Sequence, residues 1–284
     1  MKKTSPQSIA HPARSRLLST LKIVLVVLVT GLSSACGQKK ANGLILAGST
    51  SVQPFAEALA QAYVKLHPEI SIDVQGGGSS AGIMSAQTDT ADIGMSSRNL
   101  KDDETKLWSV EIAKDGLVVI VNPKNPIVGL TLSQVRDIYS GAVTNWSQLG
   151  GNNAAIHVIT REEGSGTRSA FESLVMNKLD IDPRSIVQDS NGTVRLLVGD
   201  DVNAVGYISL GLVNTKVRAL QLDGVIASRE NVINGTYTLS RPYLFVCHNE
   251  PTGEVKAFID YVLSPQGKAV LDLEGLITTS LGGQ

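Results

Sequence analysis

The sequence predicts an α/β protein with a mainly parallel sheet covered by helices. Short β-branched runs alternate along the 284-residue chain with stretches whose apolar residues recur every three to four positions, which is typical of βαβ units. In addition, turns rich in Ser, Thr and Gly follow several of the strand-like runs. Open α/β sheets bind ligands at the carboxyl ends of their strands, so these turns are the candidate binding loops.

The alternation is clearest in the first half of the chain. Residues 44–47 and 70–74 are predicted strands, and the apolar residues over 52–66 mark one face of a helix between them. A third strand is predicted over 91–95. Residues 117–121 are almost entirely β-branched, as expected for a strand buried on both faces.

The second half repeats this pattern. A helix over 132–139 is expected to stop at Gly141, because glycine commonly ends helices. The remaining predicted elements are helices near 194–198, over 255–262 and from Pro265, and strands over 156–160, 205–210 and 244–247.

The first 35 residues differ from the rest of the chain. They contain basic but no acidic residues, and their apolar run 23–32 is too short to span a bilayer but fits a secretory signal. The end of the segment resembles a bacterial lipoprotein signal in which Cys36 is lipidated and becomes the mature N-terminus, although the small residues before the cysteine depart from the usual pattern. We therefore expect a signal peptide over 1–35 and a tether over 36–42. Ordinary cleavage near Ala35 or an uncleaved anchor are the alternatives.

Charge and cysteine content exclude several classes of function. Five of the 25 Lys and Arg and none of the 26 Asp and Glu precede Cys36, which leaves 20 against 26, a net charge of −6. An acidic body argues against nucleic acid or an anionic membrane surface as partners, and an anion site in it has to rely on local, oriented dipoles. The chain's two cysteines are Cys36 and Cys247, so once Cys36 is acylated neither a disulfide framework nor a zinc cluster is possible.

The turn after strand 156–160 is the strongest candidate for a binding loop. It places Arg161 before a turn that contains Ser165, Gly166 and Thr167, directly ahead of an apolar helical pattern. The free N–H groups of a helix start attract oxyanions, the hydroxyls add donors, and an arginine can give a planar two-pronged contact. In isolation, such a turn is more often a plain helix cap.

Three further loops share this chemistry. Residues 48–51, 78–80 and 96–98 are rich in Ser, Thr or Gly, and each follows one of the first three predicted strands. Each alone is an ordinary Ser/Gly connection. Four such loops, one of them carrying Arg161, indicate convergence on a small oxyanion.

The same loops admit a catalytic alternative. Residues 78–82 satisfy the G-x-S-x-G nucleophile motif of α/β hydrolases, with Ser80 at its centre. The triad histidine would have to be His67, His157 or His248, and none stands in a favourable sequence context. A secreted serine hydrolase is therefore the weaker hypothesis. No nucleotide-binding, dinucleotide-binding or metal-ligand spacing is present, and we expect no enzyme activity, no cofactor and no metal site.

Taken together, these motifs identify a family resemblance. In order along nearly the whole chain after Cys36, residues 48–52, 76–82, 91–98 and 161–168 resemble the phosphate-binding proteins of ABC phosphate importers. The resemblance implies a type II periplasmic-binding-protein fold, in which two α/β domains joined by two hinge crossovers close on a ligand cleft.

The resemblance also implies domain boundaries. The crossovers would fall near residues 121–122 and 241–242. Domain 1 would then be discontinuous, over 43–121 and 242–284, and domain 2 would cover 122–241.

Carried over position by position, the resemblance implies a set of site residues. Glu163 would pair with Arg161, and Arg98 would add a donor. In the best-known members the third loop presents an aspartate that accepts a proton from phosphate and rejects sulfate, whereas this chain has Ser97 there. The implied phosphate contacts are Thr50, Ser51, Ser79, Ser97, Arg161, Ser165, Gly166 and Thr167.

The function implied is capture of inorganic phosphate and its delivery to the permease subunits of an ABC transporter. The expected protein is a monomer, secreted across the cytoplasmic membrane and either lipid-anchored through Cys36 to its outer face or periplasmic. A receptor for another tetrahedral oxyanion (sulfate, molybdate or tungstate) is the alternative among binding proteins.

Overall fold

A computed structural model describes residues 43–278. The predicted signal peptide, the tether and Cys36 lie outside these residues. Within the described part of the chain, no helix combines the length and the apolar character that crossing a membrane requires.

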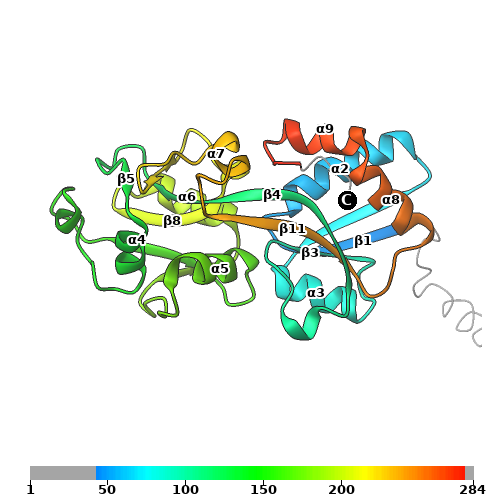
Figure 1. Ribbon diagram of the computed structural model, residues 1–284, viewed down its shortest axis with the longest axis horizontal. Coiled ribbons are helices and arrows are strands. Elements are labelled where there is room, and N and C mark those ends of the chain that lie inside the picture. The colour runs from blue at the N-terminus through cyan, green and yellow to red at the C-terminus, as the bar shows by residue number, and fades with distance from the viewer. Residues whose placement is uncertain (1–42, 279–284) are drawn as a thin grey trace, which may run out of the picture. The chain divides into compact units, whose positions relative to one another are not determined.

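Most strands form one long mixed sheet (Figure 1), in which the short β9 (Arg218–Ala219) also pairs with β4. A separate two-stranded sheet joins β10 (Gln221–Leu222) and β5 (Gly129–Leu130). Parallel strands make up the two ends of the long sheet, where β1 pairs with β2 and β3, and β6 pairs with β7 and β8. Between them, β11 and β4 run antiparallel to each other and to their outer neighbours β3 and β8. The prediction of a mainly parallel sheet therefore does not hold at the centre of the sheet, where two long antiparallel strands connect the parallel ends. In sheet order, the strands are β2 (Ser71–Gly76), β1 (Gly43–Gly48), β3 (Ile93–Ser96), β11 (Ser240–Cys247), β4 (Trp108–Val121), β8 (Ala204–Ser209), β6 (His157–Arg161) and β7 (Ile186–Gln188).

Helices cover both faces of this sheet (Figure 1). The predicted helices all form, although Leu66, assigned to the apolar face of the first one, is 62% exposed at its end. The helix that stops before Gly141 begins with a capping box between Thr131 and Gln134. The described α-helices are α2 (Gln53–Leu66), α3 (Ser79–Gln87), α4 (Leu132–Tyr139), α5 (Gly166–Phe171), α6 (Asn191–Asp200), α7 (Arg229–Ile233), α8 (Gly253–Leu263) and α9 (Pro265–Leu273).

The hydrophobic core divides into two main clusters. One, which we call the first lobe, packs α2, α8 and α9 on the sheet end formed by β1, β2 and β3. The other, the second lobe, packs α4, α5 and α6 around β6 and β8. Along β4 the side chains pass from the first cluster at Ala113 to the second at Leu117. The chain returns from Leu239, directly before β11, to Tyr243 within that strand. The predicted domain limits stay a prediction, but residues 117–121, assigned there to domain 1, pack in the second lobe.

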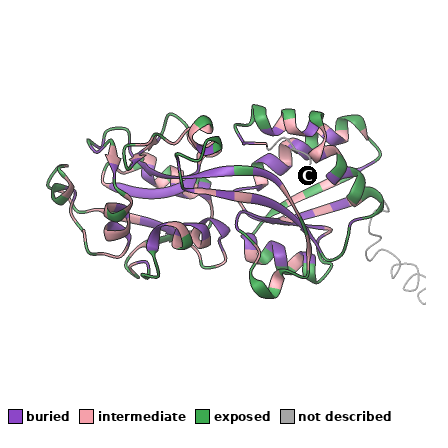
Figure 2. Cartoon of the chain, in the orientation of Figure 1, coloured by how far each residue is buried: buried purple, intermediate pink, exposed green. Residues whose placement is uncertain are grey.

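Strand β4 is longer than the sequence indicates. Its residues 117–121 are buried, as predicted for a strand covered on both faces (Figure 2). The preceding residues 108–116 include Glu111, Lys114 and Asp115 and therefore lack a continuous apolar signal. They extend the strand into the first lobe by pairing with β11.

Candidate functional site

The loops that follow β1, β2 and β3 meet in the first lobe. Because these strands are parallel neighbours, Gly48 at the end of β1 lies in register with Gly76 and Met95. Beyond the strand ends, the Ser49 hydroxyl donates to the Ser97 hydroxyl (2.9 Å), and the Ser97 N–H donates to the Ser79 hydroxyl (3.0 Å). The convergence that the sequence predicted for these loops is therefore present.

The start of α5 in the second lobe faces these hydroxyls at very short range. A Cβ atom on Gly166 would lie 2.1 Å from Ser79 Oγ and 2.7 Å from Ser97 Oγ. Glycine is thus required here for close approach of the backbone. The Ser165 hydroxyl caps the helix by accepting from the Arg168 N–H (3.2 Å).

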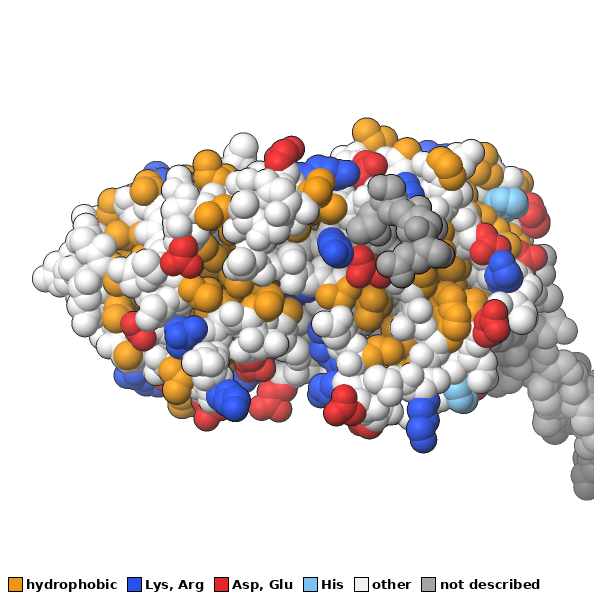
Figure 3. Space-filling view, in the orientation of Figure 1, with side chains coloured by type: hydrophobic (Ala, Val, Ile, Leu, Met, Phe, Trp, Pro, Cys, Tyr) orange, Lys and Arg blue, Asp and Glu red, His pale blue; other side chains and the backbone are white. Residues whose placement is uncertain are grey.

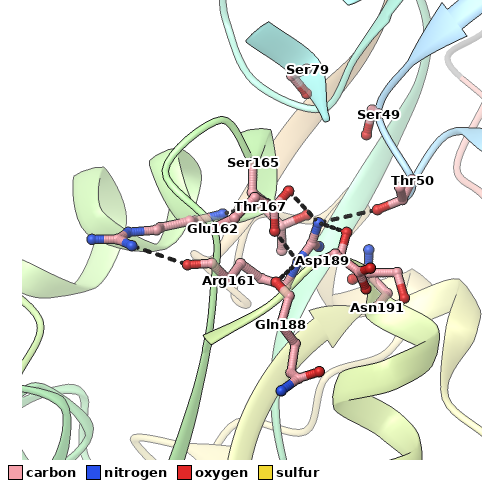
Figure 4. Close-up of polar contacts among 12 residues, drawn as sticks. Ser49, Thr50, Ser79, Arg161, Glu162, Ser165, Thr167, Gln188, Asp189 and Asn191 are labelled. Carbon is pink, nitrogen blue, oxygen red and sulfur yellow. Dashed lines mark hydrogen bonds and ion pairs between the residues drawn. The ribbon is translucent and has the colours of Figure 1, made fainter. Parts of the chain in front are cut away.

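Arg161, at the end of β6, is the buried cation of the site (Figure 4). Its side chain is 1% exposed and forms a two-pronged ion pair with Glu162, with Nε–Oε2 at 3.0 Å and Nη2–Oε1 at 2.9 Å. Nη2 also donates across to Thr50 Oγ1 of the first lobe (3.1 Å), and the backbone carbonyls of Gln188 and Asp189 accept from Nε and Nη2. Nη1 is buried without any hydrogen-bond partner in the described chain. A buried guanidinium donor without an acceptor calls for an anionic or carbonyl ligand.

The acidic partner of Arg161 differs from the predicted one. The family resemblance implied Glu163 as the partner, whereas Glu162 makes the ion pair and Glu163 is exposed. The reason is the tight turn after β6, in which the Ser165 N–H donates to the Glu162 carbonyl (3.1 Å). This turn keeps the Glu162 side chain beside the guanidinium and directs the next residue to solvent.

The sequence analysis missed Asn191, at the start of α6. Its amide donates to the Ser51 hydroxyl across the two lobes (2.8 Å), and Ser51 Oγ also lies 2.6 Å from Thr167 Oγ1. A polar turn between a strand and a helix, with Ser190 as the helix cap, was available as a signal. It was overlooked because strand β7 before it has only three residues.

A buried ion pair on the two long strands supports this contact. Asp115 on β4 and Arg241 on β11 are register partners, 1% and 4% exposed, and their side chains approach to 2.9 Å. The guanidinium also donates to Ser51 Oγ (3.3 Å), and the carboxylate accepts hydrogen bonds from the hydroxyls of Tyr243 and Ser209.

Arg98 is also buried, but it lies away from Arg161. Its guanidinium makes a two-pronged ion pair with Glu104 (2.7 and 2.8 Å) and reaches Ser80 Oγ at 3.3 Å. The hydrogen bonds from Arg98 hold the pKa of the Glu104 carboxyl below its ordinary value. The two charges offset each other, so this pair braces the third loop.

The geometry gives no support to the hydrolase hypothesis. Within residues 43–278, Ser80 Oγ accepts from Arg98, while each histidine of that range pairs with an acid elsewhere: His67 with Glu69, His157 with Asp201 and His248 with Asp89. No group of side chains suited to hold a metal ion occurs in the same part of the chain.

Comparison with known proteins identifies the family. A protein-family model described as a PBP superfamily domain matches residues 33–266. The phosphate-binding protein PstS of Bacillus subtilis (strain 168) is 31% identical over 255 residues, which cover 88% of this chain and 83% of that protein. The chain belongs to the PstS family. PstS of Borreliella burgdorferi is 27% identical over 90% of this chain and 97% of that protein.

Solved structures agree with the PstS assignment. A putative phosphate ABC transporter substrate-binding protein from Clostridium perfringens, with bound phosphate, is 44% identical with a TM-score of 0.82, over 84% of this chain and all of that chain (100%). An ABC-type phosphate transport receptor from Vibrio cholerae is 39% identical with a TM-score of 0.71, over 83% of this chain and 100% of that chain. The predicted periplasmic-binding-protein fold is confirmed. PstS proteins are transport receptors and not enzymes.

Proposed function

We propose that this chain captures inorganic phosphate between its two lobes and delivers it to the permease subunits of an ABC importer. The single observation that carries the proposal is the buried Arg161, whose Nη1 has no acceptor in the described chain, among hydroxyls from both lobes. The relative solved with bound phosphate supports the choice of ligand, since it shares 44% of its residues with this chain.

The proposed ligand donors are the residues that surround Arg161 and the start of α5. Hydroxyls and backbone N–H groups supply most of the contacts, because Glu162 offsets the charge of Arg161. The surface is consistent with this view, since acidic and basic side chains are interspersed over the face shown in Figure 3. The proposed phosphate contacts are Thr50, Ser79, Ser97, Arg161, Ser165, Gly166 and Thr167.

We further propose that phosphate enters and leaves by movement of the lobes about β4 and β11. Hydrogen bonds join the lobes in this structure. They include one from the Ser80 N–H to the Gly164 carbonyl (3.1 Å) and one from the Arg161 guanidinium to the Thr50 hydroxyl. These bonds have to open before an anion can reach Arg161, whose side chain is 1% exposed. The chain crosses from the first lobe to the second along β4 and returns along β11, so these two strands are the proposed hinge.

Selectivity for phosphate is proposed to rest on hydroxyls. Ser97, in the place of an acid, accepts a hydrogen bond from Ser49, and its oxygen lies 3.3 Å from Ser79 Oγ. When Ser97 donates its proton to Ser79, one acceptor position remains for a protonated phosphate oxygen. Because a hydroxyl carries no charge, it repels sulfate less than a carboxylate does. We therefore expect weaker discrimination against sulfate than in relatives with an aspartate here.

The lipid anchor on Cys36 remains part of this proposal. It would tether the receptor at the outer face of the cytoplasmic membrane, close to the permease. Mass spectrometry of the membrane-extracted protein tests it, because acylation adds the mass of the lipid to the peptide that begins at Cys36.

Calorimetric titration with phosphate, sulfate, molybdate and tungstate tests the function. Phosphate is expected to bind most tightly, and Arg161→Ala is expected to weaken it by at least about 2 kcal/mol, since a desolvated charge-assisted contact is lost. Absence of phosphate binding by the wild-type protein would refute the proposal, and near-normal affinity in the variant would show that the site is elsewhere.

A further inference from the structure

The Ser51 hydroxyl occupies an unusual position between the lobes. Three groups contact its oxygen: the Asn191 amide at 2.8 Å, the Arg241 guanidinium at 3.3 Å and the Thr167 hydroxyl at 2.6 Å. All four residues are buried. A serine hydroxyl has two acceptor positions and one proton, so these three contacts use its entire hydrogen-bonding capacity.

Counting protons fixes the direction of the shortest of these bonds. The Asn191 amide nitrogen and the Arg241 guanidinium can only donate, so they occupy both acceptor positions of Ser51. The proton between Ser51 and Thr167 must then belong to Ser51. Thr167 accepts it, and its own proton is left to donate elsewhere.

The direction depends on the orientation of the Asn191 amide, whose oxygen and nitrogen could be exchanged. The Ser209 N–H, which can only donate, is 3.2 Å from Asn191 Oδ1. This contact places the oxygen toward Ser209 and the nitrogen toward Ser51, so the assignment is determined by the surrounding backbone.

The orientation of the Arg241 guanidinium is also fixed, by its ion-pair partner Asp115. Asp115 Oδ2 accepts from both Nε (3.0 Å) and Nη2 (2.9 Å), which holds the guanidinium in one plane. Arg241 lies on β11 where the core changes from one lobe to the other. Its contact with Ser51 therefore depends on the two long strands that join the lobes.

We propose that Asn191 and Arg241 are positioning residues that, through Ser51, turn the Thr167 hydroxyl into an obligatory donor to the bound anion. Ser51 thereby changes role, from the ligand contact that the sequence implied to a relay, since its proton is already committed to Thr167. Because Asn191 and Thr167 belong to the second lobe and Ser51 to the first, the relay is complete only when the lobes are together. The inference rests on the proposed phosphate site and adds residues to it.

Neutron diffraction from deuterated wild-type crystals tests the bond direction without any variant. The expected result is a deuteron on Ser51 Oγ directed at Thr167 Oγ1. A Thr167 deuteron directed at Ser51, or separation of the two hydroxyls, overturns the proposal.

A double-mutant cycle tests the functional consequence with phosphate as the titrant. Thr167→Val should weaken phosphate binding about 10- to 100-fold, the range for a hydrogen bond to a charged group. Asn191→Ala should weaken it at least about threefold in the wild-type background but less than about twofold when Thr167→Val is already present. Equal losses in both backgrounds would mean that Asn191 acts only on structure, and would overturn the proposal.

Asn231→Ala is the matched control. Asn231 also lies on a second-lobe helix, and its amide donates to a backbone carbonyl, that of Ile226. Its replacement should leave phosphate affinity unchanged. If the wild-type protein binds no phosphate while the Ser51 deuteron points at Thr167, the proposed function fails and the hydrogen-bond arrangement stands.

Discussion

The tight packing of the two lobes at Gly166 allows a test of the site that separates binding from folding. Replacing Gly166 by alanine places a Cβ atom 2.1 Å from Ser79 Oγ and 2.7 Å from Ser97 Oγ, whereas ordinary contacts begin at 3.4 Å. The start of α5 must then withdraw from the first lobe by more than about 1 Å, because the packed loops cannot yield that distance.

The size of the effect follows from the bonds that this movement breaks. A hydrogen bond to a charged group contributes about 1.5–3 kcal/mol. Loss of one or two such bonds to the anion would reduce phosphate affinity by about 2–4 kcal/mol, or about 30- to 1,000-fold. Unfolding stability should change less than affinity, because withdrawal of the α5 start breaks contacts between the lobes but leaves the hydrophobic core of each lobe in place.

Calorimetry with phosphate and thermal unfolding without it measure the two quantities. Gly164→Ala is the control from the same turn, because a Cβ atom at Gly164 would meet nothing within 4 Å. It should bind phosphate like the wild-type protein. Near-normal affinity of Gly166→Ala would refute the reasoning, since the α5 start could then not contact the ligand from this position.

Two further predictions concern the acidic partners of the buried arginines. Glu162→Gln should weaken phosphate binding about tenfold or more, because it loosens the Arg161 guanidinium, whereas Glu163→Gln should change it little; equal effects in calorimetry would contradict the observed pairing. Since Arg98 lowers the pKa of Glu104, the stabilisation from that pair is present above the unfolded pKa of about 4.3 and is lost as pH falls through the lower folded value. Urea unfolding should accordingly show Glu104→Gln less stable than wild type at pH 7, with a difference that shrinks below about pH 4; a pH-independent difference would exclude this linkage.

The sequence predicted most local structure because helices and their caps depend on residues close together. The helix over 132–139 ends where expected, since its apolar period and its capping residues lie within one short segment. Strand β4 shows the limit of this approach. The apolar pattern of its first half breaks off at Lys114, Asp115 and Gly116, and the strand is continuous there because it pairs with β11, more than a hundred residues away.

The sequence likewise predicted only part of the candidate site. The four hydroxyl-rich loops were predicted because each follows a strand, and parallel strands bring their carboxyl ends to one edge. The choice of Glu162 over Glu163 depends on the exact course of one turn, which residue types alone do not specify. The contacts of Asn191 and Arg241 with Ser51 join positions far apart in the sequence.

The sequence by itself therefore determined the secondary structure, the family and the chemistry of the anion site, because these depend on residue types at short spacing. Only the tertiary structure decided which acid holds Arg161, how the lobes share β4 and β11, and in which direction the Ser51 proton points. Those properties arise from distances and angles between separate segments, which folding sets and local pattern leaves open.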